Sequence, residues 1–143
     1  MTFTADDRIA ITDLIALHGH LCDDGDLEGL RELFTPDVVY DVSSFGGEPI
    51  HGIDALIQAG IDLGEGNPVG HHVTNIVLTG IADDRVTARS KGIGISADGG
   101  CASLTYDDTI VRTPGGWRIS CRVAVVRRTP LNEKFDRSGS FTK

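Results

Sequence analysis

Four long strand-like runs fill the second half of this 143-residue chain, and they constrain its fold more than any other feature. Acidic or glycine-containing turns separate the runs, and Thr113-Pro114-Gly115-Gly116 between the last two is typical of a β-hairpin. Consecutive runs joined by short turns predict a meander of antiparallel strands. The four runs cover residues 71–79, 86–96, 102–112 and 117–128.

The first half of the chain has helical spacing instead. Thr4-x-x-Asp7 resembles a capping box, and apolar residues then recur at helical intervals until the sequence Asp-Asp-Gly-Asp at 23–26 ends the pattern. A short second helix is predicted around residues 27–34 and a third over 53–63, with a β-rich segment at 38–42. Helices followed by a meander predict an α+β fold, in which one curved antiparallel sheet wraps three helices into a cone. The open end of such a cone is a natural pocket.

Size and charge restrict the class of protein. The length fits one domain, predicted over residues 1–131, with a polar tail at 132–143. A net charge of −8 argues against binding to nucleic acid or to an anionic membrane surface. No apolar run is long enough to cross a bilayer, and the amino terminus lacks the features of an export signal. Three cysteines without a C-x-x-C motif fit a reducing compartment, so we expect a cytoplasmic protein.

Five polar residues are candidates for chemistry. His18 and Asp23 fall near the end of the first helix, and Arg122 interrupts an apolar strand. His71 and His72 open a strand, where alternation would point one of them inward and the other outward. A histidine oriented by a carboxylate can abstract a proton at neutral pH, and an arginine can stabilise the resulting anion. Each residue also has a structural interpretation. Asp23 fits an acidic helix end, a strand histidine is usually structural, and a buried arginine needs an anionic partner.

Other chemistries have less support from the sequence. The histidines and cysteines lack the spacing of a zinc site, and G-x-S-x-G is absent. Gly92-Ile93-Gly94 falls within a strand, which is the wrong context for a dinucleotide-binding loop. We therefore expect no metal and no cofactor.

Taken together, the motifs of the chain resemble the SnoaL-like branch of the nuclear transport factor 2-like superfamily, over about residues 6–131. The resemblance implies the same cone, a cystatin-like fold. Within the superfamily the chain is most similar to the subgroup of hexachlorocyclohexane dehydrochlorinase, scytalone dehydratase and bile-acid dehydratase. The order and spacing of the following segments carry the resemblance: Ile11-Thr12-Asp13-Leu14, Leu33-Phe34-Thr35-Pro36-Asp37, Pro49-Ile50-His51-Gly52, Gly70-His71-His72-Val73-Thr74-Asn75 and Trp117-Arg118-Ile119.

The resemblance implies roles for three of the candidates. By register, the carboxylate of the dehydrochlorinase falls on Asp23, its histidine on His71 and its arginine on Arg122. His71 would then be the base, Asp23 the group that orients it, and Arg122 the stabiliser of the anion. Many relatives carry a tyrosine five residues before the helix-end aspartate, where this chain has His18 as a candidate hydrogen-bond donor.

These residues predict a cofactor-independent lyase or isomerase, of the dehydratase or dehydrohalogenase type, that takes a proton from a small apolar organic substrate. Two alternatives stay open: a non-catalytic binding or scaffold module, and chemistry of the polyketide cyclase or epoxide hydrolase type. A ketosteroid-isomerase mechanism is less favoured, because the register of its base gives Val42 with Asp41 one place away. From the pattern of apolar residues, we expect the pocket to be lined by Leu17, Leu21, Val42, Phe45, Leu56 and Leu104.

The last strand also bears on assembly. Val123, Val125 and Val126 make both of its faces apolar. One face would line the pocket, and the other would contact another subunit, because a monomer rarely exposes so much apolar surface. We therefore expect a homo-oligomer, either a trimer or a dimer.

Overall fold

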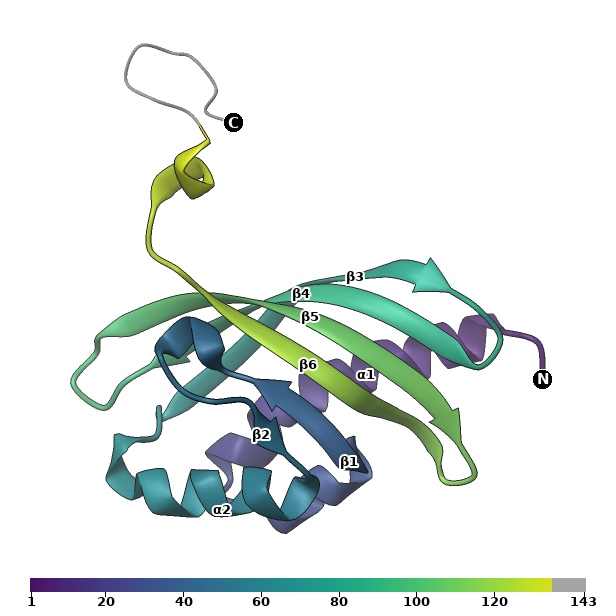
Figure 1. Ribbon diagram of the computed structural model, residues 1–143, viewed down its shortest axis with the longest axis horizontal. Helices are drawn as coiled ribbons and strands as arrows, with labels where there is room; N and C mark the ends of the chain where they lie inside the picture. The colour runs from purple at the N-terminus through teal and green to yellow at the C-terminus, as the bar shows by residue number, and fades with distance from the viewer. Residues whose placement is uncertain (135–143) are drawn as a thin grey trace.

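The computed structural model describes residues 1–134, and in them it places six strands and two α-helices (Figure 1). The helices are α1 (Ala5–Asp23) and α2 (Ile53–Leu63). The strands are β1 (Phe34–Asp41), β2 (Ile50–His51), β3 (Gly70–Ile81), β4 (Arg85–Ile95), β5 (Cys101–Thr113) and β6 (Gly116–Arg127). Short 3₁₀ turns are η1 (Glu28–Glu32), η2 (Ser43–Phe45), η3 (Gly64–Gly66) and η4 (Pro130–Glu133).

The α+β architecture is confirmed. Figure 1 shows α1 and α2 on the same side of a curved sheet, which arches over them. Each of the four predicted strand runs coincides with one of β3 to β6 to within two residues at either end, and α2 has the predicted bounds. The core lies between the helices and the sheet, where Ile11 and Ile15 of α1 meet Phe34, Val38 and Ile119.

The sheet is mixed rather than fully antiparallel. Its strand order is β2-β1-β6-β5-β4-β3, and every neighbouring pair among residues 1–134 is antiparallel except β1 and β6, which run parallel. The antiparallel prediction holds for the meander, because tight turns reverse the chain there. No turn connects β1 to β6, so local sequence does not set their relative direction.

The second predicted helix is smaller than expected. Residues Glu28–Glu32 form the 3₁₀ turn η1, and Phe34 begins β1 instead of ending a helix. Leu30 and Leu33 are buried as the pattern required. Helical spacing over so few residues cannot separate a 3₁₀ turn from an α-helix, because both bring residues three apart to one side.

The first turn of α1 is hydrogen-bonded to the end of β5 and the start of β6. Thr4 and Asp7 form the predicted capping box. The Asp7 carboxylate also accepts hydrogen bonds from both terminal nitrogens of Arg112, at 3.1 and 3.2 Å, and from Nε1 of Trp117 at 3.0 Å. These bonds, of which the one from Arg112 is the strongest influence, hold the pKa of Asp7 well below its usual range. The capping residue therefore also anchors the helix to β5 and β6.

A β-bulge in β6 decides which residues of that strand point inward. Thr109 pairs with Cys121 whereas Ile110 pairs with Ile119, so Ser120 is an extra residue in β6. Before the bulge Ile119 is buried, and after it Arg122 and Ala124 are buried. An inserted residue reverses the alternation of faces beyond it. The bulge therefore turns Arg122 into the interior.

The polar tail is only partly described. Asn132 and Glu133 belong to η4, and residues 135–143 of the predicted tail lie outside the described residues. Within residues 1–134, none of the helices has the length and apolar character needed to cross a membrane.

Candidate functional site

A cavity of about 650 Å³ opens between the carboxyl-terminal half of α1, α2 and the inner face of the sheet. Most of its lining is apolar, and it includes Val42, Phe45, Leu56 and Leu104 among the residues expected there. The polar side chains of the lining are His18, Cys22, Tyr40, Asn67, His71, His72, Ser96 and Tyr106. An apolar cavity of this size with few polar groups is typical of a binding site for a small organic molecule.

Two of the expected lining residues lie elsewhere. Leu17 is 43% exposed and faces a separate groove beside Trp117, on the other side of α1. Leu21 packs against the core and is not among the residues that line the cavity. The expectation for these two does not agree with the structure. Most of α1 is apolar, so its sequence pattern left the inward face ambiguous, and contact with β3 determines it.

His71 and Asp23 meet at the edge of the cavity. The Nδ1 atom of His71 lies 2.7 Å from Oδ1 of Asp23, and the backbone N–H of His71 donates to both carboxylate oxygens, at 3.0 and 3.1 Å. The backbone contacts fix the carboxylate at the strand, and the Nδ1 contact then orients the ring. The hydrogen-bond pattern assigns the ring proton to Nδ1, because a carboxylate can only accept. In the neutral ring, this arrangement leaves the lone pair on Nε2, where a general base requires it.

The two residues come from the end of α1 and the start of β3, elements that are far apart in the sequence. Gly19 allows them to meet, because a side-chain carbon there would collide with the backbone carbonyl of His71. The close approach of α1 to β3 therefore depends on a glycine one turn before Asp23.

Arg122 occupies a different position from the one its expected role requires. Its side chain is fully buried and does not line the cavity. Nε and Nη2 donate to the two carboxylate oxygens of Asp108, at 2.7 and 2.9 Å. Burial opposes the charge of Arg122, but the paired carboxylate outweighs burial and raises the pKa of the guanidinium above its usual value. Arg122 is therefore a charged group beneath the cavity floor, with no direct access to a bound molecule.

Aromatic rings separate Arg122 from the cavity. The guanidinium carbon lies 4.3 Å from the ring centre of Tyr106 and 5.9 Å from that of Tyr40, both of which line the cavity. A cation over a ring face interacts favourably with it. The sequence analysis missed Tyr40, Tyr106 and Asp108. Strand alternation could have found the last two, since Tyr106, Asp108 and Ile110 occupy every second position of β5 and all are buried.

His18 lines the cavity as a buried, neutral imidazole. It is 6% exposed, and its ring meets those of His71 and Tyr106 edge-on, with centres 6.3 and 6.4 Å away. Burial, followed by the charges of Arg122 and His71, lowers the pKa of His18 well below its usual value. Nε2 contacts the Sγ atom of Cys22 at 3.6 Å, and burial raises the pKa of that thiol to about 11. Nδ1 has no hydrogen-bond partner in the described part of the chain.

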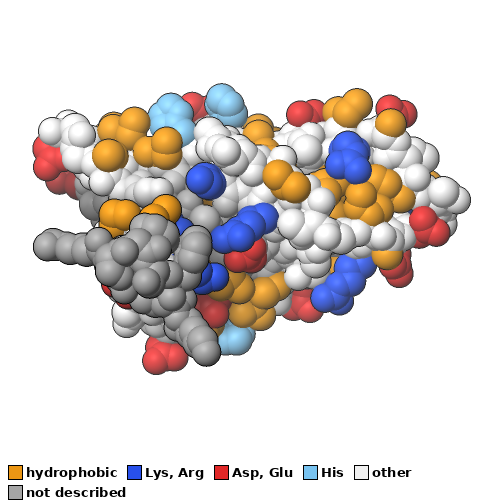
Figure 2. Space-filling model, turned by 90° about the horizontal axis from the view of Figure 1, so that it is seen from above, with side chains coloured by type: hydrophobic (Ala, Val, Ile, Leu, Met, Phe, Trp, Pro, Cys, Tyr) orange, Lys and Arg blue, Asp and Glu red, His pale blue; other side chains and the backbone are white. Residues whose placement is uncertain are grey.

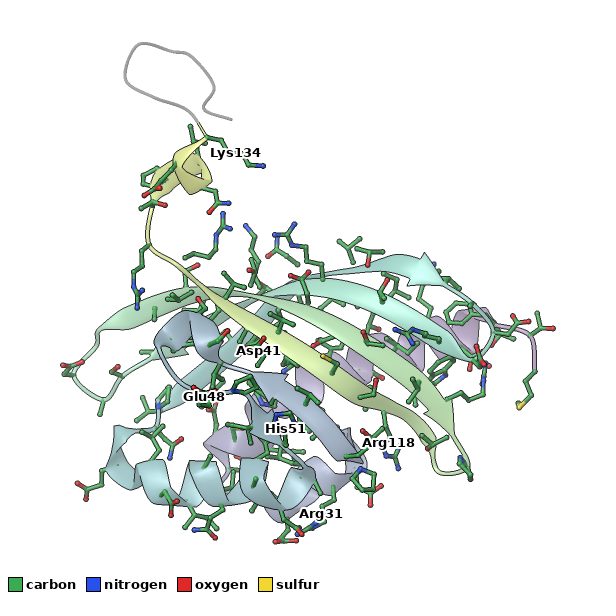
Figure 3. The ribbon with its side chains drawn as sticks, viewed as in Figure 1. Arg31, Asp41, Glu48, His51, Arg118 and Lys134 are labelled. Atoms are coloured by element: carbon green, nitrogen blue, oxygen red, sulfur yellow. The ribbon has the colours of Figure 1, made fainter. Side chains whose placement is uncertain are left out.

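Asp41 and His51 lie away from the cavity. Figure 3 shows Asp41 at the end of β1 and His51 on the neighbouring strand β2. The carboxylate of Asp41 accepts the backbone N–H of Ser43 at 2.9 Å, and hydrogen bonding to Ser43 lowers its pKa. Asp41 therefore stabilises a turn and is not positioned as a base in the cavity. Within residues 1–134, no three His, Cys, Asp or Glu side chains gather in a way that could hold a metal ion.

The chain is similar to several known proteins. The family model of the SnoaL-like domain matches residues 4–123. An uncharacterized protein of Mycobacterium tuberculosis is 31% identical over 124 residues, which cover 82% of this chain and 83% of the relative. An NTF2-like protein with a cystatin-like fold from Novosphingobium aromaticivorans is 29% identical, with 88% of this chain and 85% of that chain covered and a TM-score of 0.73. A cystatin-fold protein of unknown function from Nostoc punctiforme has a TM-score of 0.76 at 23% identity, with 92% and 99% covered.

Proposed function

Because this chain belongs to the family of SnoaL-like domains, which includes dehydratases, polyketide cyclases and ring-hydroxylase subunits, we propose that it is a cofactor-independent lyase or isomerase. The observation that carries the proposal is the 2.7 Å contact between Nδ1 of His71 and Asp23 at the edge of an apolar cavity. Such a pair provides a general base and the carboxylate that orients it, which are the groups needed to remove a proton from carbon at neutral pH.

In the proposed reaction, Nε2 of His71 takes a proton from a carbon atom next to an electron-withdrawing group. The electron pair of the broken C–H bond forms a carbon–carbon double bond. In an elimination, a hydroxyl or halide leaves from the adjacent carbon with its bonding electrons, and a departing hydroxyl takes the proton from the imidazolium of His71 to become water. In an isomerisation, the imidazolium returns the proton to another carbon. Asp23 stabilises the imidazolium in either case.

Arg122 has an indirect role in this proposal. Its charge lies beneath the aromatic floor and is balanced by Asp108, so it stabilises negative charge in the cavity only through space and through the rings above it. This differs from the direct contact that the resemblance implied.

The alternatives receive less support from the geometry. A binding or scaffold module does not need a histidine and a carboxylate within hydrogen-bond distance, yet this chain has them. Epoxide opening by an Asp–Arg–Asp set needs two carboxylates around a water molecule. Asp108 is fully engaged with Arg122 below the cavity, so the pair that is present does not meet that requirement.

The experiment is a screen of uncharged ketones, β-hydroxy ketones and halogenated cycloalkanes in D₂O, with loss of water or halide and deuterium incorporation as readouts. For any compound that reacts, His71→Ala should lower turnover about 10²-fold or more. His20→Ala is the matched control, because His20 is exposed on the opposite side of α1. Full activity of His71→Ala would exclude the proposed base.

We also propose that copies of the chain associate through the outer face of the sheet. Figure 2 shows hydrophobic side chains on that side, interspersed with Lys and Arg. Val77 and Ile81 of β3 are 58% and 46% exposed. Light scattering should give the mass of a trimer or a dimer, and Val77→Asp should shift it toward the monomer. A monomeric mass for the unaltered protein would contradict this proposal.

A further inference from the structure

Tyr106 has a hydroxyl group that the proposed reaction does not use. It stands in the middle of β5, is 4% exposed and lines the cavity. Within residues 1–134, no other group hydrogen-bonds to its hydroxyl. Burial raises the pKa of Tyr106 above its usual value, so the phenol stays protonated and can donate. The hydroxyl is not one of the enclosed polar atoms of the described residues, so water or a ligand in the cavity can accept its hydrogen bond.

Two other groups pack against the ring of Tyr106. One is Gly92 of β4, where a β-carbon would stand 2.6 Å from the Cε2 atom of the ring. The guanidinium carbon of Arg122 lies 4.3 Å from the ring centre. The mid-strand Gly92 thus has a role that its sequence context did not reveal. Because both supports belong to rigid strands, the hydroxyl is held in a fixed place, as preorganised stabilisation requires.

The charges around the cavity restrict what it can bind. Among residues 1–134, none of the side chains lining it is an Asp, Glu, Lys or Arg. Arg122 beneath the floor is neutralised by Asp108, and Asp23 at the edge is paired with His71. An anionic ligand would lose its hydration without gaining a free cation. The cavity therefore favours an uncharged molecule.

From this arrangement we infer that Tyr106 is a further catalytic residue, donating a hydrogen bond to the carbonyl oxygen of an uncharged ketone whose α-proton His71 removes. The inference rests on the proposed function and specifies its substrate class. As the C–H bond breaks, its electron pair forms the carbon–carbon double bond of the enolate, and the carbonyl π electrons move to oxygen. The proton goes to Nε2 of His71. The hydroxyl of Tyr106 keeps its proton and strengthens its hydrogen bond to the negative oxygen.

Tyr106 suits this role better than its neighbours do. The guanidinium carbon of Arg122 lies 4.3 Å from the ring centre of Tyr106 and 5.9 Å from that of Tyr40, so the cation packs more closely against Tyr106. The ring of His18 contacts the rings of both His71 and Tyr106, so the proposed base and the proposed donor share one neighbour. His18 itself is a poor candidate for the donor, because its Nδ1 atom is enclosed by protein.

The first test measures binding and does not depend on catalysis. The probes are β-tetralone and tetralin, a ketone and the hydrocarbon of the same size, titrated by calorimetry. The unaltered protein should prefer the ketone. Tyr106→Phe should lower that preference about threefold to tenfold, the loss expected for one neutral hydrogen bond. Gly92→Ala should also lower it, because the added methyl group displaces the ring while leaving the hydroxyl in the chain.

Tyr40→Phe is the comparison variant, and thermal unfolding checks that each variant is folded. The inference is overturned if Tyr106→Phe keeps the ketone preference, or if Tyr40→Phe loses more of that preference than Tyr106→Phe does. It is also overturned if the unaltered protein binds neither probe, or if it binds both equally well. The second test follows deuterium exchange at the α-carbon of β-tetralone, which Tyr106→Phe should slow about 10²-fold. If the ketone preference depends on Tyr106 but the unaltered protein catalyses no exchange, the hydrogen bond stands and the proposed catalysis fails.

Discussion

The α-carbon of Gly19 packs against the backbone carbonyl of His71 so closely that a methyl group has no room between them. This contact sets the distance between α1 and β3. Asp23 follows one turn later on the same helix and reaches the imidazole of His71 from there. The contact between the proposed base, His71, and the carboxylate that orients it therefore depends on the absence of a side chain at Gly19.

Gly19→Ala should push α1 away from β3 and separate Asp23 from His71. We expect a loss of about 1–3 kcal/mol in the free energy of unfolding, the usual cost of overpacking, and a loss of turnover similar to that of His71→Ala. Urea unfolding and the activity screen measure both. Gly60→Ala in α2 is the matched control. There the new methyl group meets only the flexible end of Leu27, so stability should be kept or slightly raised.

Asp23→Asn should lower turnover about 10²-fold or more while the fold persists. The amide oxygen can still accept the backbone N–H of His71, but the ring loses the carboxylate that fixes its tautomer and stabilises its positive charge. Steady-state kinetics with the best substrate from the screen, together with thermal unfolding, separate loss of chemistry from loss of structure. Turnover close to that of the unaltered protein would show that Asp23 does not orient a base.

The buried pair of Arg122 and Asp108 should be sensitive to removal of one partner. Asp108→Leu leaves a buried cation unpaired, and Arg122→Met leaves a buried carboxylate, so each should cost about 3–5 kcal/mol in the free energy of unfolding. The double variant should lose much less than the sum of the two, because both charges are gone. Urea unfolding of the set provides a double-mutant cycle, and additive losses would contradict the pairing.

The stability of the protein should decrease as pH falls from 7.5 to 5.5, in part because of His18. Its pKa is lowered by burial and by the charges of Arg122 and His71, so below about pH 6.5 the unfolded chain binds a proton there that the folded protein does not. Each pH unit in that range should cost up to about 1.4 kcal/mol from this residue. His18→Gln should show a shallower decline in urea unfolding, and His20→Ala should keep the original slope. Equal slopes in all three proteins would rule out His18 as the source.

Much of the architecture could be predicted because it depends on short-range patterns. The capping box at Thr4 and Asp7, the alternation in β4 and β5, and the tight turn at Pro114 and Gly115 are each specified by neighbouring residues. The direction of β1 beside β6 could not be predicted in this way, because no turn joins those strands. The same applies to the bulge at Ser120, which depends on pairing with β5.

In the candidate site, too, some features could be predicted from the sequence and others depend on long-range contacts. The sequence by itself supplied a histidine, a carboxylate and an arginine with the spacing typical of a family. Four of the six apolar residues that it predicted for the lining do line the cavity. Only the tertiary structure brought Asp23 to His71, turned Leu17 outward, and buried Arg122 against Asp108 below Tyr106. Residue types and local propensities are written along the chain, whereas contacts between residues distant in sequence depend on how helices and strands pack, and one glycine or one inserted residue is enough to change them.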